Sequence, residues 1–288
     1  MYRKTLIISS LLGALFLSSC SLQTLAIRQM EPIFQNSADA LFAESDYELA
    51  KQALPANLKL IEGLLQSEPD NERFLLLAAQ GYAGYAMGFL EDEQPQRARA
   101  IYLRARNYAL RALRLHQKID WRKTPLSQIE KQLALCDDDA LPALFWSGFS
   151  WAGYINLSLT DPQAIAELPR VQAMMKRVEE LDASYYHGAV YLFKGTIYGM
   201  KPKMLGGDPE RAKFWFEKNL QLTRGKFLLT YIYLAKYYAA NIMDETLFDE
   251  YINKVLQYDT PDEPGLELLN AIARQKAKRL QAMKDELF

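Results

Sequence analysis

Cysteine and histidine are scarce in this sequence, and their scarcity excludes several kinds of site. The 288 residues include two Cys and two His. Neither His116 nor His187 has a Cys, an Asp or a second His at a spacing typical of metal ligands. Cys20 falls in an N-terminal processing motif, so only Cys136 remains for the body of the protein. We therefore predict no internal disulfide, no metal site and no bound cofactor.

An excess of charge of either sign is also lacking. Lys and Arg together number 34, Asp and Glu together number 35, and the formal net charge is −1. A balanced chain of this kind lacks the basic field with which proteins attract nucleic acids or anionic lipid surfaces. The sequence therefore predicts no nucleic-acid partner.

The N-terminus has the pattern of a bacterial lipoprotein signal peptide. Arg3 and Lys4 precede an uncharged, mostly apolar stretch over residues 5–17. This stretch is shorter than the roughly 20 apolar residues that a membrane-spanning helix needs. Two serines then lead to Cys20, which is the lipobox arrangement in which the thiol takes a diacylglycerol. An ordinary secretory signal followed by an incidental Cys is the alternative.

We accordingly expect cleavage before Cys20 and a membrane attachment through its lipid. Residues 1–19 are then the signal peptide, residues 20–40 the lipidated N-terminus and tether, and residues 41–288 the body. Each buried methylene contributes about 0.8 kcal/mol, so several acyl chains hold a protein almost permanently. Ser21, rather than Asp, follows the lipidated residue. This favours the outer membrane, with the body facing the periplasm.

The body has the apolar periodicity of helices, and alternating strand patterns are lacking. We predict an all-α single domain of about ten helices, separated by clusters of Pro, Gly, Asp and Asn. The expected helices lie near 46–67, 71–90, 95–116, 139–159, 162–181, 184–199, 208–222, 227–241, 244–257 and 264–285.

Pairs of these helices have the spacing of a degenerate tetratricopeptide array. Gly195 in one helix and Ala212 in the next are small residues that permit close approach, and Phe216 is an aromatic that fills the space between the pair. The fold class that we predict is therefore a tetratricopeptide-like helical-repeat array. Such arrays usually bind other chains or enclose grooves.

Two segments stand out by their apolar and aromatic content. Residues 141–160 carry no charge over 20 residues, but five Ser, Thr and Asn side chains make them a poor membrane span. We predict a helix buried inside the array, and the same for residues 227–238. Their aromatic residues either fill the core or line a cavity. The candidate cavity or ligand residues are Trp146, Phe149, Tyr154, Asn156, Tyr231 and Tyr238.

No pattern in the chain predicts an enzyme. Residues 148–152, Gly-Phe-Ser-Trp-Ala, differ by one residue from a nucleophile elbow, but they fall in the middle of an expected helix. Gly206, Gly207 and Asp208 form an expected turn in which Asp208 caps a helix that starts at Pro209. These three residues are candidates for a structural motif or a partner contact.

An ordered set of motifs makes the chain resemble a known family. The set comprises the lipobox at Cys20, residues 179–182 leading to Tyr-Tyr-His-Gly-Ala at 185–189, Gly-Gly-Asp-Pro-Glu-Arg-Ala at 206–212, and Asn-Ala-Ile-Ala at 270–273. Together they resemble TatT, the T-component associated with tripartite ATP-independent periplasmic (TRAP) transporters. Asn219 is a departure, because the family more often has a small Ala there.

The resemblance implies a function that periodicity does not reveal. TatT-like proteins are periplasmic lipoproteins, similar to a member that forms a homotrimer with a pore or cleft through each protomer and binds the solute-receptor P-component. By this resemblance the chain would help to deliver a ligand of hydrophobic character toward a TRAP permease, without a covalent step. The alternative is a generic tetratricopeptide-like envelope scaffold that carries no transported ligand.

Overall fold

The computed structural model describes residues 26–201 and 203–288. The predicted signal peptide and lipidation site at Cys20 lie outside these residues. The described part confirms the all-α class, with helices joined by loops and no strand. Residues 26–42 form a first helix. The helices that follow are α2 (Tyr47–Ser67), α3 (Glu72–Tyr85), α4 (Pro95–His116), α5 (Leu126–Leu133), α6 (Leu141–Asn156), α7 (Pro162–Ala166), α8 (Leu168–Asp182), α9 (Tyr185–Gly199), α10 (Pro209–Thr223), α11 (Leu229–Leu234), α12 (Glu245–Leu256), α13 (Glu267–Ala282) and α14 (Lys284–Leu287).

Proline and capping residues explain several of these boundaries. The segment expected as one helix over 162–181 is two, α7 and α8, since Pro169 stands in the first turn of α8 and favours a new start there. The N-cap predicted at Asp208 is confirmed, because its carboxylate accepts a hydrogen bond of 3.1 Å from the backbone N–H of Arg211. Two short π-helical segments, η1 (Ala86–Leu90) and η4 (Ala235–Ala239), interrupt the α-helical pattern.

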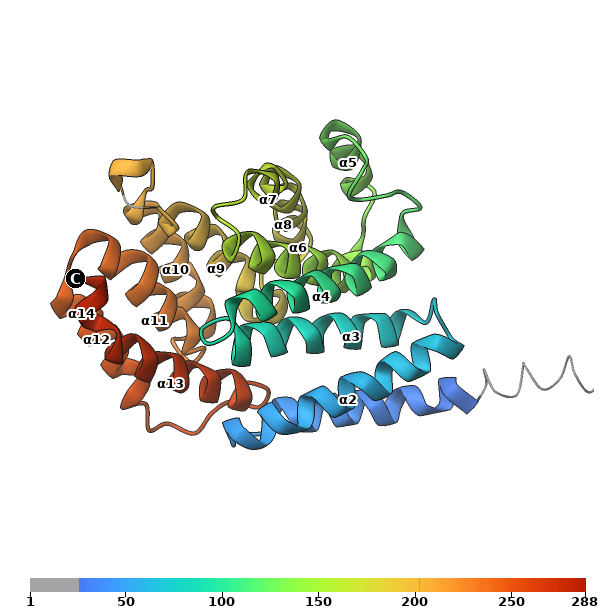
Figure 1. The fold of residues 1–288 in the computed structure, drawn as a ribbon, viewed down its shortest axis with the longest axis horizontal. Coiled ribbons are helices and arrows are strands. Elements are labelled where there is room, and N and C mark those ends of the chain that lie inside the picture. The colour runs from blue at the N-terminus through green and yellow to red at the C-terminus, as the bar shows by residue number, and fades with distance from the viewer. Residues whose placement is uncertain (1–25, 202) are drawn as a thin grey trace, which may run out of the picture.

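The helices pack as an arc whose C-terminal end returns to its N-terminal half (Figure 1). Helices α3, α4, α6 and α8 pack in succession, α9 packs against α10, and α13 contacts both α2 and η1. Five charged residues join the two ends, and we call them the closing cluster: Glu91, Asp92, Glu93, Lys276 and Arg279. Lys276 Nζ lies 2.7 Å from Glu91 and 2.6 Å from Asp92. The array is therefore closed around a central space.

The close approach that the sequence predicts between small residues occurs between α9 and α10. A Cβ at Gly195 would overlap the ring of Phe216, and Ala212 is fully buried. The ring of Phe216 is also fully buried, so it fills the space above Gly195. This confirms the tetratricopeptide-like packing of the pair.

Helix α6 is buried on most faces, as its lack of charge predicts. Phe145 and Trp151 are fully buried, and so is Ser150 in the middle of the helix. A nucleophile elbow needs a strand-to-helix turn, so this geometry rules out that arrangement for Ser150. Over residues 26–201 and 203–288, no helix has both the length and the apolar character to cross a membrane.

The start of α9 departs from the continuous helix expected over 184–199. Tyr186, His187 and Gly188 have φ angles of 47°, 59° and 67°, which is a left-handed turn. Left-handed backbone costs L-residues roughly 1–2 kcal/mol each, so other contacts must hold it. One such contact comes from Asn219 of α10, whose side-chain amide donates to the carbonyl oxygens of His187 and Gly188. Periodicity carries no information about such a turn.

Candidate functional site

The central space contains a cavity of about 390 Å³. This lies within the range of small-molecule sites, about 300–1,000 Å³. Its walls come from both ends of the chain, from η1, α4, α6, α8, α9, α11, η4, α13 and α14. Most of the lining is apolar, including Phe149, Leu192, Phe193, Phe227, Ile232 and Leu280. The cavity is therefore suited to a ligand with a large apolar surface.

One wall of the cavity is charged and includes four of the five closing-cluster residues: Glu91, Asp92, Lys276 and Arg279. Burial by itself would lower the pKa of Lys276, but the carboxylates of Glu91 and Asp92 raise it above its ordinary value. Burial would likewise raise the pKa of Asp92, but Lys276 holds it below its ordinary value. Both groups are therefore charged at neutral pH, and each neutralises the other.

Two of the six candidate cavity residues line the cavity. Phe149 and Asn156, both on α6, belong to its wall. The side-chain amide of Asn156 donates a hydrogen bond of 3.3 Å to the hydroxyl of Tyr237. A contact of Phe149 or Asn156 with a ligand stays a prediction.

The other four candidates lie elsewhere. The ring of Tyr231 lies 6.4 Å from that of Tyr251, on the α12 side of its helix. The hydroxyl of Tyr238 lies 3.4 Å from Glu210 of α10. Tyr154 packs its ring against the guanidinium groups of two α4 arginines. Trp146 lies 4.7 Å from the ring of Tyr186 and borders a polar hollow of the surface.

The tyrosines that do line the cavity on this side are Tyr233 and Tyr237, together with Lys236. Aromatic density pointed to the correct segment, but it could not choose the face. The segment changes from α11 to the π-helical η4 at residue 235, which rotates the following side chains relative to a regular helix. The other π-helical segment, η1, contributes Met87 to the same wall. No signal in the sequence marks either π segment.

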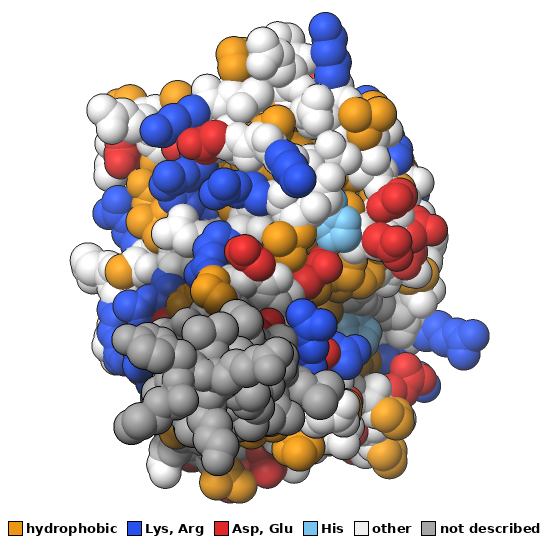
Figure 2. All heavy atoms as spheres, turned by 90° about the vertical axis from the view of Figure 1, so that its right-hand side faces the viewer, with side chains coloured by type: hydrophobic (Ala, Val, Ile, Leu, Met, Phe, Trp, Pro, Cys, Tyr) orange, Lys and Arg blue, Asp and Glu red, His pale blue; other side chains and the backbone are white. Residues whose placement is uncertain are grey.

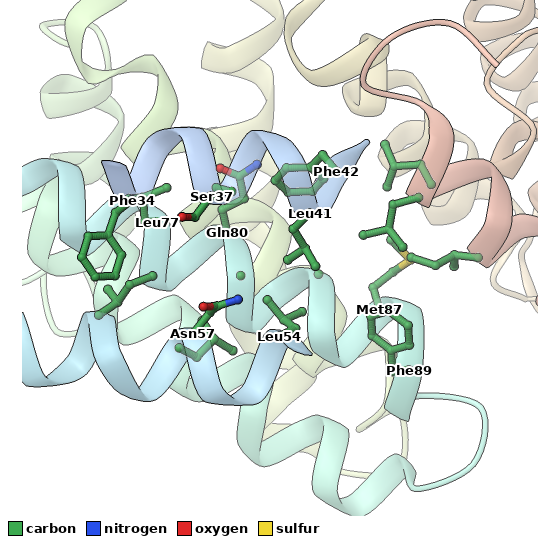
Figure 3. Close-up of a pocket in the computed structure, with 18 of the residues that line it drawn as sticks. Phe34, Ser37, Leu41, Phe42, Leu54, Asn57, Leu77, Gln80, Met87 and Phe89 are labelled. Atoms are coloured by element: carbon green, nitrogen blue, oxygen red, sulfur yellow. The ribbon is translucent and has the colours of Figure 1, made fainter. Parts of the chain in front are cut away.

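A second, smaller pocket lies beside the cavity, between the helix of residues 26–42, α2, α3 and α13. Figure 3 shows its apolar lining, with Phe34 and Phe42 from the first helix and Leu54 from α2. Three residues border both spaces: Met87, Tyr186 and Leu269. The left-handed turn therefore places the Tyr186 side chain at the boundary between the two spaces.

The remaining candidate residues lie in the turn before α10. Gly206 is exposed with a φ angle of 87°, and Asp208 caps the helix. The backbone N–H of Asp208 also donates to the carbonyl of Tyr198 at 2.8 Å, which ties the turn to the end of α9. These contacts give the motif a structural role, and its contact with a partner stays a prediction.

A metal centre and a reactive thiol are both lacking among the described residues. In residues 26–201 and 203–288, no group of three His, Cys, Asp or Glu could hold a metal ion. Burial raises the pKa of the Cys136 thiol to about 11, which leaves it protonated and unreactive. Basic and acidic side chains share the face shown in Figure 2. The interior cavity is accordingly the candidate functional site.

The matches to known proteins cover nearly the whole chain. The family model described as TRAP transporter T-component matches residues 43–288. An uncharacterized protein of Treponema pallidum (strain Nichols) is 25% identical over 310 aligned residues, which cover 96% of this chain and 95% of that relative. The similarity therefore extends along almost the full length of both chains.

Proposed function

The chain belongs to the TRAP transporter T-component family, and we propose that it serves such a transporter as a lipid-anchored accessory of the cell envelope. In this role it binds the transporter's solute receptor, the P-component. Its interior cavity then holds or passes on the ligand that the receptor carries, without a covalent step. Attachment through the lipidated Cys20, location at the periplasmic face of the outer membrane and assembly as a homotrimer are parts of the same proposal.

The observation that carries this proposal is the mostly apolar cavity inside a closed helical array. A scaffold that only bound other chains would need its outer surfaces and grooves, and an empty interior of this size costs stability through lost packing. Retention of such a space is consistent with a bound small molecule. The charged residues that close the array lie in the wall of the same space, so closure and the cavity are physically coupled.

Light scattering coupled to size exclusion tests the partner. The mature chain with Cys20→Ser, which removes the lipid, would be measured alone and mixed with a TRAP solute receptor from the same organism. We expect a trimer that shifts to a larger complex when the receptor is added. A monomer that ignores this receptor would contradict the proposal and favour the envelope scaffold without a transported ligand.

A further inference from the structure

The basic groups of the cavity wall differ in how they are paired. Lys276 lies within hydrogen-bond distance of Glu91 and Asp92, and Arg279 pairs with Glu93. Lys236 is different, because no carboxylate of the described residues lies within 4.0 Å of its ammonium group. Protein surrounds most of the Lys236 side chain, yet the side chain is accessible to water. This is expected for a side chain that faces the cavity. The wall thus carries one positive charge that forms no ion pair, although Glu91 and Asp92 of the same wall attract it from beyond 4.0 Å.

Two hydroxyl groups line the same cavity with hydrogens available for donation. The hydroxyl of Tyr237 accepts from Asn156, so its own hydrogen is free to point elsewhere. Lys236 Nζ lies 5.3 Å from the centre of the Tyr237 ring, which places both groups together. The hydroxyl of Thr196 is buried and has no hydrogen-bond partner among the described residues. Thr196 stands three residues before Gly199, where an added Cβ would meet the backbone carbonyl and the Cβ of Tyr237, so Thr196 shares the helix face that Tyr237 contacts.

A buried hydroxyl without a partner and a partly desolvated ammonium are both costly to maintain. An anion with two or more oxygens would satisfy them, because a carboxylate accepts several hydrogen bonds and charge-assisted bonds are the strong ones. The rest of the cavity has the opposite character. Phe193, Phe227 and Ile232 are among the apolar side chains that line the same cavity.

We propose that the cavity takes a single-chain amphiphile with one anionic head, such as a carboxylate, whose head lies at Lys236, Tyr237 and Thr196 and whose apolar tail lies along the aromatic wall. This inference rests on the proposed function only in assuming that the cavity holds a ligand. A neutral apolar ligand would leave the hydroxyl of Thr196 without a partner, and it would add no close counter-charge to the ammonium of Lys236, which Glu91 and Asp92 attract only from beyond 4.0 Å. A cationic head would meet repulsion from the same group.

Binding of three probes with the same chain length tests the head group. Dodecanoate, dodecanol and dodecyltrimethylammonium would be titrated calorimetrically into the mature chain carrying Cys20→Ser, below their micellar concentrations. We expect dodecanoate to bind at least tenfold more tightly than dodecanol, and the cation to bind most weakly. A tenfold ratio corresponds to about 1.4 kcal/mol, which is within reach of one charge-assisted hydrogen bond.

Variants locate the head. Lys236→Met keeps the length of the side chain but removes its charge, and we expect it to abolish the preference for dodecanoate while dodecanol binds as before. Thr196→Val should weaken dodecanoate binding by a smaller factor, and it serves as the second variant if Lys236→Met unfolds. Lys176→Met, on the outer surface of α8, is the matched control and should change nothing.

Equal binding of all three probes, unchanged by Lys236→Met, would overturn this inference and leave the ligand cavity of the proposed function intact. Preference for the cation would overturn it as well. If no probe binds, both the inference and the ligand role of the cavity fail, whereas the receptor complex is judged separately by light scattering.

Discussion

The side-chain amide of Asn219 donates hydrogen bonds to the carbonyl oxygens of His187 at 2.8 Å and of Gly188 at 2.9 Å. Asn219 is fully buried, and its own oxygen accepts from the hydroxyl of Thr230 at 2.6 Å. One side chain of α10 thereby joins the left-handed turn of α9 to α11. The same turn carries Tyr186, which borders both internal spaces. The departure noted at Asn219 in the sequence therefore has a structural role.

Asn219→Ala should destabilise the protein. The change leaves two backbone carbonyl groups and one hydroxyl without their partner, and each unsatisfied buried group costs about 1–3 kcal/mol. We expect a lower midpoint in urea denaturation with an unchanged slope. Asn253→Ala, at an exposed position of α12, is the control and should unfold as the natural protein does. An Asn219→Ala variant with the stability of that control would show that the left-handed turn does not depend on the hydrogen bonds of Asn219.

Two glycine substitutions should change stability in opposite directions. Gly195→Ala would push a methyl group into the Phe216 ring, and overpacking of this kind costs about 1–3 kcal/mol. Gly63→Ala meets nothing within 4 Å on an exposed face of α2, so it should stabilise the helix by about 0.5–1 kcal/mol. Thermal denaturation of both variants checks the pair. A stabilised Gly195→Ala variant would contradict the close packing of α9 on α10.

Lys276→Met should weaken the closure of the array. It removes the partner of Glu91 and Asp92 in a place where the lysine side chain is only 8% exposed. Breaking a buried ion pair by removing one partner costs about 3–5 kcal/mol. We expect Tm to fall by roughly 2–4 °C for each kcal/mol of unfolding free energy that is lost. Lys254→Met is the control, since it loses a half-exposed pair with Glu250 and its position over the rings of Tyr231 and Tyr251, and it should lower Tm much less.

The stabilising effect of Lys276 should depend on pH at the acidic end. Because the pKa of Asp92 is lowered in the folded state, its contribution is complete above the ordinary value of 3.8 and is lost as pH falls through the lower folded value. The raised pKa of Lys276 matters only at alkaline pH, since its contribution is complete below 10.5. The difference in Tm between the natural protein and Lys276→Met should therefore stay constant from about pH 5 to 9 and shrink below about pH 4. A difference that grows in acid would contradict this assignment.

Cys20→Ser should abolish lipid attachment. In cells supplied with labelled palmitate we expect label on the natural protein and none on the variant, which should move from the membrane fraction to the soluble periplasmic fraction. Cys136→Ser is the control and should keep the label, because Cys136 is buried in the body. Label retained by Cys20→Ser would contradict the predicted lipidation site.

The cavity candidates show how far sequence reasoning reaches. Residues 141–160 and 227–238 were expected to be central, and both segments contribute to the cavity wall, through Phe149 and Asn156 in the first and Tyr233 and Tyr237 in the second. Aromatic density identified the second segment but could not choose its face, since Tyr231 lies in α11 before the π-helical η4 and Tyr238 lies within η4. A π-helical segment changes the direction in which the following side chains point, and no residue type encodes it reliably.

By itself the sequence determined the all-α class, the helix-pair packing at Gly195 and Phe216, and the cap at Asp208. These depend on contacts within one helix or between neighbours in the chain, and so local residue types suffice. Only the tertiary structure decided that Lys276 meets Glu91 and Asp92, across 185 and 184 residues, and that Lys236 faces a cavity. Such pairings depend on the summed curvature of all the intervening helices, which no local pattern records.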